Sequence, residues 1–187
     1  MRFDKLTTKF QQAFADAQSA ALGNDNAYIE PQHLLLALLN QSEGGSGSLL
    51  SRAGVAVPAL KNSLNQSIER LAKVDGEGGD VQVSRELNTL LNLTDKEAQK
   101  RGDQFIASEI FLLALAQDKG ETGRLLKQHG LTKEHLETAV AAVRGSDNVS
   151  SQEAEGSREA LNKYTVDVTE RAQQGKLDPV KIGRAHV

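Results

Sequence analysis

The sequence predicts an all-α fold of eight helices, built as two tandem four-helix repeats related by a pseudo-two-fold axis. Apolar residues recur at helical spacing, the pattern occurs twice along the chain, and a glycine-rich segment separates the two copies. No apolar run reaches the ~18 residues that a membrane-spanning helix needs. We therefore expect a helical domain with no membrane partner.

The repeat keeps a nearly constant offset. Residues 28–38 return as 105–115, a shift of 77 positions. Beyond the glycine-rich stretch 44–47 the shift is 76, and Gly54 corresponds to Gly130. One residue was therefore gained or lost in that stretch, where a change of loop length costs little.

Each copy is expected to open with a long amphipathic helix. Apolar residues recur at steps of three and four from Leu6 to Ala21 and again from Leu87 to Ala98. Thr7 and Ser84 occupy corresponding positions at the start of each stripe. A hydroxyl there can accept a hydrogen bond from an unpaired N–H of the first turn, so both are predicted N-caps.

The later helices have their own boundary signals. Pro31 suits the first turn of a second helix, where its missing N–H costs nothing. Gly54 and Gly130 suit helix ends. Fourth helices are expected at about 58–71 and 133–144.

These elements define the expected domains. Repeat one covers 1–73 and repeat two covers 84–144, which together form one domain, 1–144. Residues 145–157 are polar, with a single isolated valine, and are predicted to be a flexible linker.

The composition argues against several classes of function. The absence of cysteine excludes disulfides, thiolate nucleophiles and Cys-ligated zinc, and fits a reducing, cytoplasmic location. The net charge of −3 is not that of a nucleic-acid-binding protein. His129 and His135 have no carboxylate at metal-ligand spacing, and His33 falls in an apolar helix, where a structural role is favoured. We expect no catalytic residue, no cofactor and no metal in this chain.

Several segments resemble the Hsp100/Clp family of AAA+ ATPases, over roughly residues 1–180. Residues 1–21 resemble the opening of the bacterial disaggregases of this family, and 28–35 resemble the double Clp N-terminal repeat. The phrase 99–106 strengthens the match, and 163–180 resembles the entry to the first ATPase module.

The resemblance implies a homohexameric machine that uses ATP and Mg²⁺ to pull unfolded or aggregated polypeptides apart, together with the Hsp70 system, under heat or other stress. Residues 158–180 would begin its first AAA+ module. The 187 residues contain no Gly-x-x-x-x-Gly-Lys-Ser/Thr phosphate loop. We therefore expect this chain to be a monomer without ATPase activity, and hexamer formation to reside in other modules.

The last residues depart from the family pattern. After Val180 the family continues Ile-Gly-Arg-Asp, whereas here Lys181 intervenes and Ala185 replaces the aspartate. The stretch 182–187 is also what a common sequencing adapter encodes. We expect 181–187 to be non-native read-through and the natural protein to continue.

The resemblance also implies candidate binding residues. An apolar groove that captures exposed hydrophobic stretches of unfolded protein would include Leu91 and Ile110. Polar positions implicated in chaperone activity correspond to Thr7, Asp103 and Glu109.

Each candidate has a structural alternative. Leu91 and Ile110 fit a buried core equally well, and Thr7 is first of all an N-cap. Glu109 lies in a first helical turn, where a carboxylate is favourable. Repeat one carries amides at the two positions where repeat two carries Asp103 and Glu109, which favours a surface role for the charges.

A second function remains open at this point. Some family members feed a protease, and their repeat domain docks a folded adaptor between its two units. A long coiled-coil insertion within the first ATPase module of the complete protein would identify a disaggregase.

Overall fold

The computed structural model describes residues 2–74, 80–145 and 147–158. Within these residues the helices are η1 (Phe3–Lys5), α1 (Thr8–Gly23), α2 (Pro31–Leu39), α3 (Gly45–Arg52), α4 (Val57–Glu69), α5 (Arg85–Lys100), α6 (Ser108–Ala116), α7 (Glu121–Gln128) and α8 (Lys133–Arg144). Two short strands, β1 (Tyr28–Ile29) and β2 (Gln82–Val83), complete the list.

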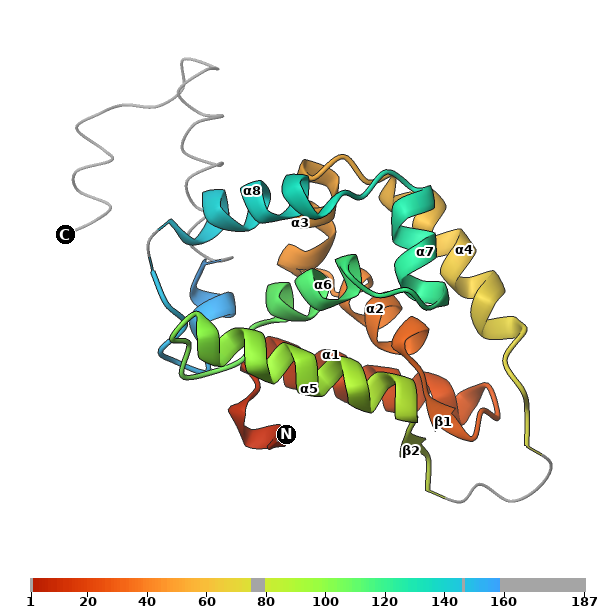
Figure 1. Cartoon of the computed structure of the whole chain (residues 1–187). Helices are drawn as coiled ribbons and strands as arrows, with labels where there is room; N and C mark the ends of the chain where they lie inside the picture. The colour runs from red at the N-terminus through yellow and green to blue at the C-terminus, as the bar shows by residue number, and fades with distance from the viewer. Residues whose placement is uncertain (1, 75–79, 146, 159–187) are drawn as a thin grey trace, which may run out of the picture.

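The described part of the chain confirms the all-α class and the division into two four-helix repeats. Repeat one supplies α1 to α4 and repeat two supplies α5 to α8 (Figure 1). The two strands were not expected. Each contains only two residues and pairs with a strand distant in sequence, so the periodicity of the local sequence does not predict them.

The strand pairing reveals the pseudo-two-fold axis. Ile29 pairs in parallel register with Val83, and Leu6 forms a parallel bridge with Ile106. A shift of 77 positions carries Ile29 to Ile106 and Leu6 to Val83. The second pair is thus the first with the roles of the two repeats exchanged, as a two-fold axis requires.

Backbone hydrogen bonds at the starts of α1 and α5 repeat the same exchange. The amide of Thr7 donates to the carbonyl of Ile106 at 3.0 Å, and the amide of Ser84 donates to that of Ile29 at 3.1 Å. Each repeat therefore anchors its first helix on the other repeat. The two halves are interlocked at this point.

The predicted helix boundaries have their expected causes. The hydroxyls of Thr7 and Ser84 accept hydrogen bonds from the third residue of α1 and α5. Pro31 is the first residue of α2. Gly54 and Gly130 follow α3 and α7 with φ of 93° and 107°, a conformation that L side chains adopt rarely.

The core lies around α2 and α6. All nine residues of α6 are buried, and eight of the nine residues of α2. In Figure 1 these two helices occupy the middle of the molecule, with α1 and α5 below them, α3 and α8 above them, and α4 and α7 to their right. Phe10 and Phe111 meet in this core, with ring centroids 5.8 Å apart.

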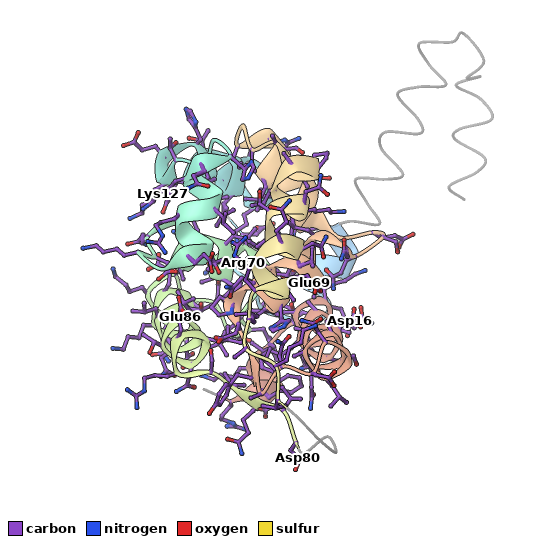
Figure 2. All side chains as sticks on the ribbon, turned by 90° about the vertical axis from the view of Figure 1, so that its right-hand side faces the viewer. Asp16, Glu69, Arg70, Asp80, Glu86 and Lys127 are labelled. Atoms are coloured by element: carbon purple, nitrogen blue, oxygen red, sulfur yellow. The ribbon has the colours of Figure 1, made fainter. Side chains whose placement is uncertain are left out.

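The outer helices also join the two repeats. Contacts link α3 to α8 and α4 to α7. Arg70, which follows α4 and is labelled in Figure 2, forms an exposed ion pair of 3.2 Å with Glu121 of α7. An exposed pair of this kind adds little stability.

The segment 147–158 packs against the domain, although 145–157 was expected to be a flexible linker. Val149 and Glu155 are buried, and 154–158 form a helical turn. Whether this segment moves in solution stays a prediction. The expected ATPase entry beyond residue 158 and the read-through 181–187 lie outside the described residues.

Candidate functional site

A cluster of buried polar side chains lies where the starts of α1 and α6 meet the end of α8. It brings together three of the five predicted site residues. Its members, here called the polar cluster, are Thr7, Asp103, Ser108, Glu109, Arg144, Glu155 and Arg158.

Glu155 joins the two repeats within this cluster. The hydroxyl of Thr7 donates to Oε2 of Glu155. The amide and the hydroxyl of Ser108 donate to the same oxygen at 3.0 and 3.1 Å. The carboxyl group of Glu155 therefore caps α6 and at the same time holds the start of α1.

The need for this cap follows from the repeat itself. In repeat one, the N-cap of α2 is Glu30, whose side chain accepts from the backbone of His33, and the next residue, Pro31, has no N–H to satisfy. The corresponding N-cap of α6 is Ala107, which has no side-chain acceptor. Glu155 instead accepts from the amide of Ser108, the residue that corresponds to Pro31, so it satisfies a first amide that α2 does not have.

Arg144 holds the other carboxylates of the cluster. Its Nη2 lies 2.9 Å from Oδ2 of Asp103, and its Nε lies 2.9 Å from Oε1 of Glu109. These side chains expose 8%, 0% and 6% of their surface, respectively. Arg158 reaches the same Oε1 of Glu109 at 2.9 Å from a more exposed position. Two cations thus neutralise two carboxylates in a largely dry site.

The electrostatics of the site follow from burial and pairing. Burial alone disfavours the charged form of Arg144, but Glu109 and Asp103 outweigh it, and the pKa of Arg144 is raised. Burial and the nearby Glu109 raise the pKa of Glu155 to about 7, although the hydrogen bonds from Thr7 and Ser108 act in the opposite direction. Glu155 therefore titrates near neutral pH.

The amides of repeat one also have partners. Asn26 corresponds to Asp103; its Oδ1 lies 3.0 Å from Nε2 of His33, and its amide donates to the carbonyl of Ala72. Gln32 corresponds to Glu109 and donates to Ser67 at 3.1 Å. Both repeats therefore bury polar side chains at these positions, and the charges of Asp103 and Glu109 do not mark an exposed surface.

His33 has the structural role that its position predicted. Its Nδ1 accepts from the amide of Glu30 at 2.9 Å, so the neutral ring donates from Nε2 to Asn26. Burial lowers the pKa of His33 to about 4. The ring is neutral at physiological pH.

Leu91 and Ile110 lie in the hydrophobic core. Leu91 exposes 4% of its surface and Ile110 none. The structure therefore does not display an apolar groove formed by these two side chains, and their role in client binding remains a prediction. Helical spacing identifies the inward face of a helix, but it cannot separate a groove floor from a sealed core.

A cavity of about 380 Å³ adjoins the polar cluster. It lies between the start of α3, the outer part of α8 and the segment that carries Glu155. Apolar side chains of Leu49, Val140 and Val143 line it together with Arg52 and Glu109. The wall is mixed, with both apolar surface and charged groups.

Sequence reasoning missed Ser108, Arg144, Glu155 and Arg158. Arg144 was seen only as a helix end and Glu155 only as part of a linker. One signal was available: Ala107 replaces Glu30 in the repeat, which leaves α6 without a local cap. Among the described residues no group of three His, Cys, Asp or Glu side chains could hold a metal ion. The cluster is built from ion pairs and caps, and it suits holding and positioning rather than bond chemistry.

The family comparison covers most of the domain. Residues 5–129 match the Clp repeat (R) N-terminal domain. Among the described residues no helix is long and apolar enough to span a membrane.

Similar proteins include the chaperone protein ClpB of Vibrio cholerae, which is 53% identical over 184 residues. The match covers 98% of this chain and 21% of that protein. ClpB of Pseudomonas putida is 48% identical, with the same coverage. The chain thus spans about a fifth of the length of these relatives.

Solved structures share the fold at lower sequence identity. The Hsp104 N-terminal domain from Candida albicans has a TM-score of 0.70 at 21% identity, covering 80% of this chain and 98% of that one. The ClpV1 N-terminal domain from Escherichia coli has a TM-score of 0.64 at 24% identity, covering 76% and 88%. The chain belongs to the Clp repeat (R) N-terminal domain family, and over nearly its whole length it is similar to ClpB chaperones.

Proposed function

We propose that this chain is the substrate-engaging N-terminal domain of an ATP-dependent chaperone that disaggregates and helps refold stress-denatured proteins. One observation carries the proposal: 53% identity with Vibrio cholerae ClpB extends over 98% of this chain. In the complete protein, ATP and Mg²⁺, hexamer contacts and the Hsp70 system would engage modules other than this domain. Its place of action would be the cytoplasm.

The proposed ligand is an exposed hydrophobic segment of an unfolded or aggregated protein. Apolar burial follows area and needs no directional partner, so it suits clients that share only the unfolded state. Burying about 300 Å² contributes roughly 7 kcal/mol at ~25 cal/mol per Å². Ordering and association costs are of similar size, so binding is expected to be micromolar or weaker. Weak capture allows a client to pass onward.

Peptide binding by this fold has support from a structural neighbour. The complex of the ClpV N-domain with a VipB peptide has a TM-score of 0.56 and covers 78% of this chain, at 19% identity. Identity at that level establishes the shared fold alone. The VipB peptide therefore does not indicate which sequence this chain binds.

The predicted contact residues act in two ways in this proposal. Leu91 and Ile110 are buried, so they contact a client only after neighbouring groups move aside. Thr7, Asp103 and Glu109 hold the polar cluster next to the cavity. Substitution of these three polar residues would change chaperone activity because it changes the shape of the cavity beside the polar cluster.

A domain exchange tests the proposed function. Residues 1–144 of this chain would replace the matching region of Vibrio cholerae ClpB, and reactivation of an aggregated enzyme would be measured with the Hsp70 system present. The client should be one whose recovery falls when the N-terminal domain is deleted. We expect the chimera to restore the rate of intact ClpB. A chimera no faster than the deletion variant would contradict the proposal.

A further inference from the structure

The segment 147–158, here called the strap, is held to the domain by backbone hydrogen bonds at two of its residues. The carbonyl of Val149 accepts from the amides of Gln104 and Phe105 at 2.8 and 3.2 Å. Further along, the carbonyl of Gln152 accepts from the amide of Thr8 at 2.8 Å. The strap thus crosses from the loop before α6 to the start of α1 (Figure 1, blue).

The side chains of the strap are mostly polar. Within it, Val149 and Glu155 are the buried residues, and Val149 is the only valine. The amide of Val149 donates to Oδ1 of Asp103 at 3.0 Å, which ties the strap to the polar cluster. A segment held by polar bonds with little apolar burial belongs to the low-stability end of a structure.

Glu155 is the charged residue of the strap that is buried in the domain. Its carboxyl group accepts from the first amide of α6, that of Ser108, and from the hydroxyl of Thr7. Burial of a carboxyl group costs free energy, which its three donors offset. Through these donors, Glu155 attaches the strap to both repeats at once.

We propose that the strap has a docked and a released position, and that Glu155 is the clasp that holds it docked over the starts of α1 and α6. In the docked position Glu155 and Arg158 also form one wall of the 380 Å³ cavity. Release removes that wall and uncovers the first turn of α6, in which Ile110 lies. The strap thereby controls access to the cavity and to the helix start beside it.

Several charged groups surround the clasp. Glu109 of α6 lies close enough to disfavour a negative charge on Glu155. The other charged groups of the cluster and cavity are Asp103 before α6, Arg144 on α8, Glu43 and Arg52 around α3, and Glu153 and Arg158 on the strap. Because Arg144 and Arg158 both form ion pairs with Glu109, they reduce its effect on the charge of Glu155.

Hydrogen exchange of the full chain, followed by NMR at single amides, tests the strap. The amides of Thr8, Gln104 and Ser108 all donate to the strap. In Glu155→Ala we expect them to exchange at least about tenfold faster than in the wild type, as local opening predicts. Glu155→Gln keeps an acceptor for Ser108 and a neutral side chain, so these amides should stay protected.

A matched variant separates docking from a change of charge. Glu153→Gln removes the same charge from the same segment at an exposed position and should leave the three amides unchanged. The amide of Thr94, which lies in the middle of α5 at a fully buried residue, reports global unfolding in every variant. If Glu155→Ala leaves the three amides as protected as the wild type, the proposal is overturned. Equal acceleration at Thr94 would show loss of the whole fold instead, and would overturn it as well.

Discussion

Nη2 of Arg144 lies 2.9 Å from Oδ2 of Asp103, and both side chains are almost completely buried. Arg144 occupies the position that Ile68 occupies in repeat one, by the shift of 76. Repeat one has amides where repeat two has Asp103 and Glu109. The arginine and the carboxylates of repeat two therefore form one buried unit that repeat one lacks.

Arg144→Ala should destabilise the domain strongly. It leaves Asp103 and part of the charge of Glu109 buried without their partner, and loss of one member of a buried pair costs about 3–5 kcal/mol. Arg158 still reaches Glu109 and limits the loss. The free energy of unfolding from urea titration measures the effect. Arg101→Ala, which removes two more exposed ion pairs, should cost about 1 kcal/mol or less. If both variants lost the same free energy of unfolding, the claim that Arg144 and its carboxylates form a buried, mutually dependent unit would be wrong.

Thr7→Ala should cost more than Ser84→Ala, although the two residues are related by the two-fold axis. Each substitution removes an N-cap, worth about 1 kcal/mol. Thr7→Ala also removes a donor to buried Glu155, which adds roughly 1–3 kcal/mol. Thermal or urea unfolding of both variants checks this difference. In a Glu155→Ala background the additional cost of Thr7→Ala over Ser84→Ala should vanish. If it persists, Glu155 is not its cause.

Much of the fold was predictable because its signals are local. Apolar stripes, caps such as Thr7, and glycines such as Gly130 act within a few residues of their own positions. The repeat added the relation between the halves. The paired strands were missed because Ile29 and Val83 meet only after the halves associate.

The site was less predictable than the fold. The sequence indicated Thr7, Asp103 and Glu109 as polar positions, and the structure brings them into one cluster. The sequence could not show that Arg144 and Glu155 complete that cluster, because ion pairs between distant segments leave no periodic pattern. Whether Leu91 and Ile110 are buried also depends on segments distant in sequence that pack over their helices, which the local sequence does not show.

Gly130→Ala should be more harmful than Gly54→Ala. Both glycines have positive φ, so alanine is strained at either position by about 1–2 kcal/mol. A Cβ on Gly130 would lie 2.7 Å from the carbonyl oxygen of Gly54, whereas a Cβ on Gly54 meets no atom within 4 Å. We expect Gly130→Ala to cost about 1–3 kcal/mol more, from overpacking. Urea unfolding of the two variants measures the difference, and equal costs would mean that the two repeats do not approach each other there.

The strap should bind less firmly as the pH rises. The pKa of Glu155 is about 7 when docked, above its ordinary value of 4.5, so the docked strap favours the protonated form. Its contribution is complete below pH 4.5 and falls as the pH rises to about 7, by roughly 3 kcal/mol at most. Exchange of the Ser108 amide between pH 5 and 8, corrected for intrinsic rates, measures the change. In Glu155→Gln the corrected exchange should not depend on pH in this way. If the wild type shows no more pH dependence than Glu155→Gln, the prediction is wrong.

Client binding itself is tested most directly by NMR titration of the isotopically labelled chain with one protein in its unfolded and its native form. The account predicts chemical-shift changes with the unfolded form alone, with micromolar or weaker affinity, at residues around α6 and the adjoining cavity. Binding of the native form with equal strength, or no shift with the unfolded form, would contradict the proposed function.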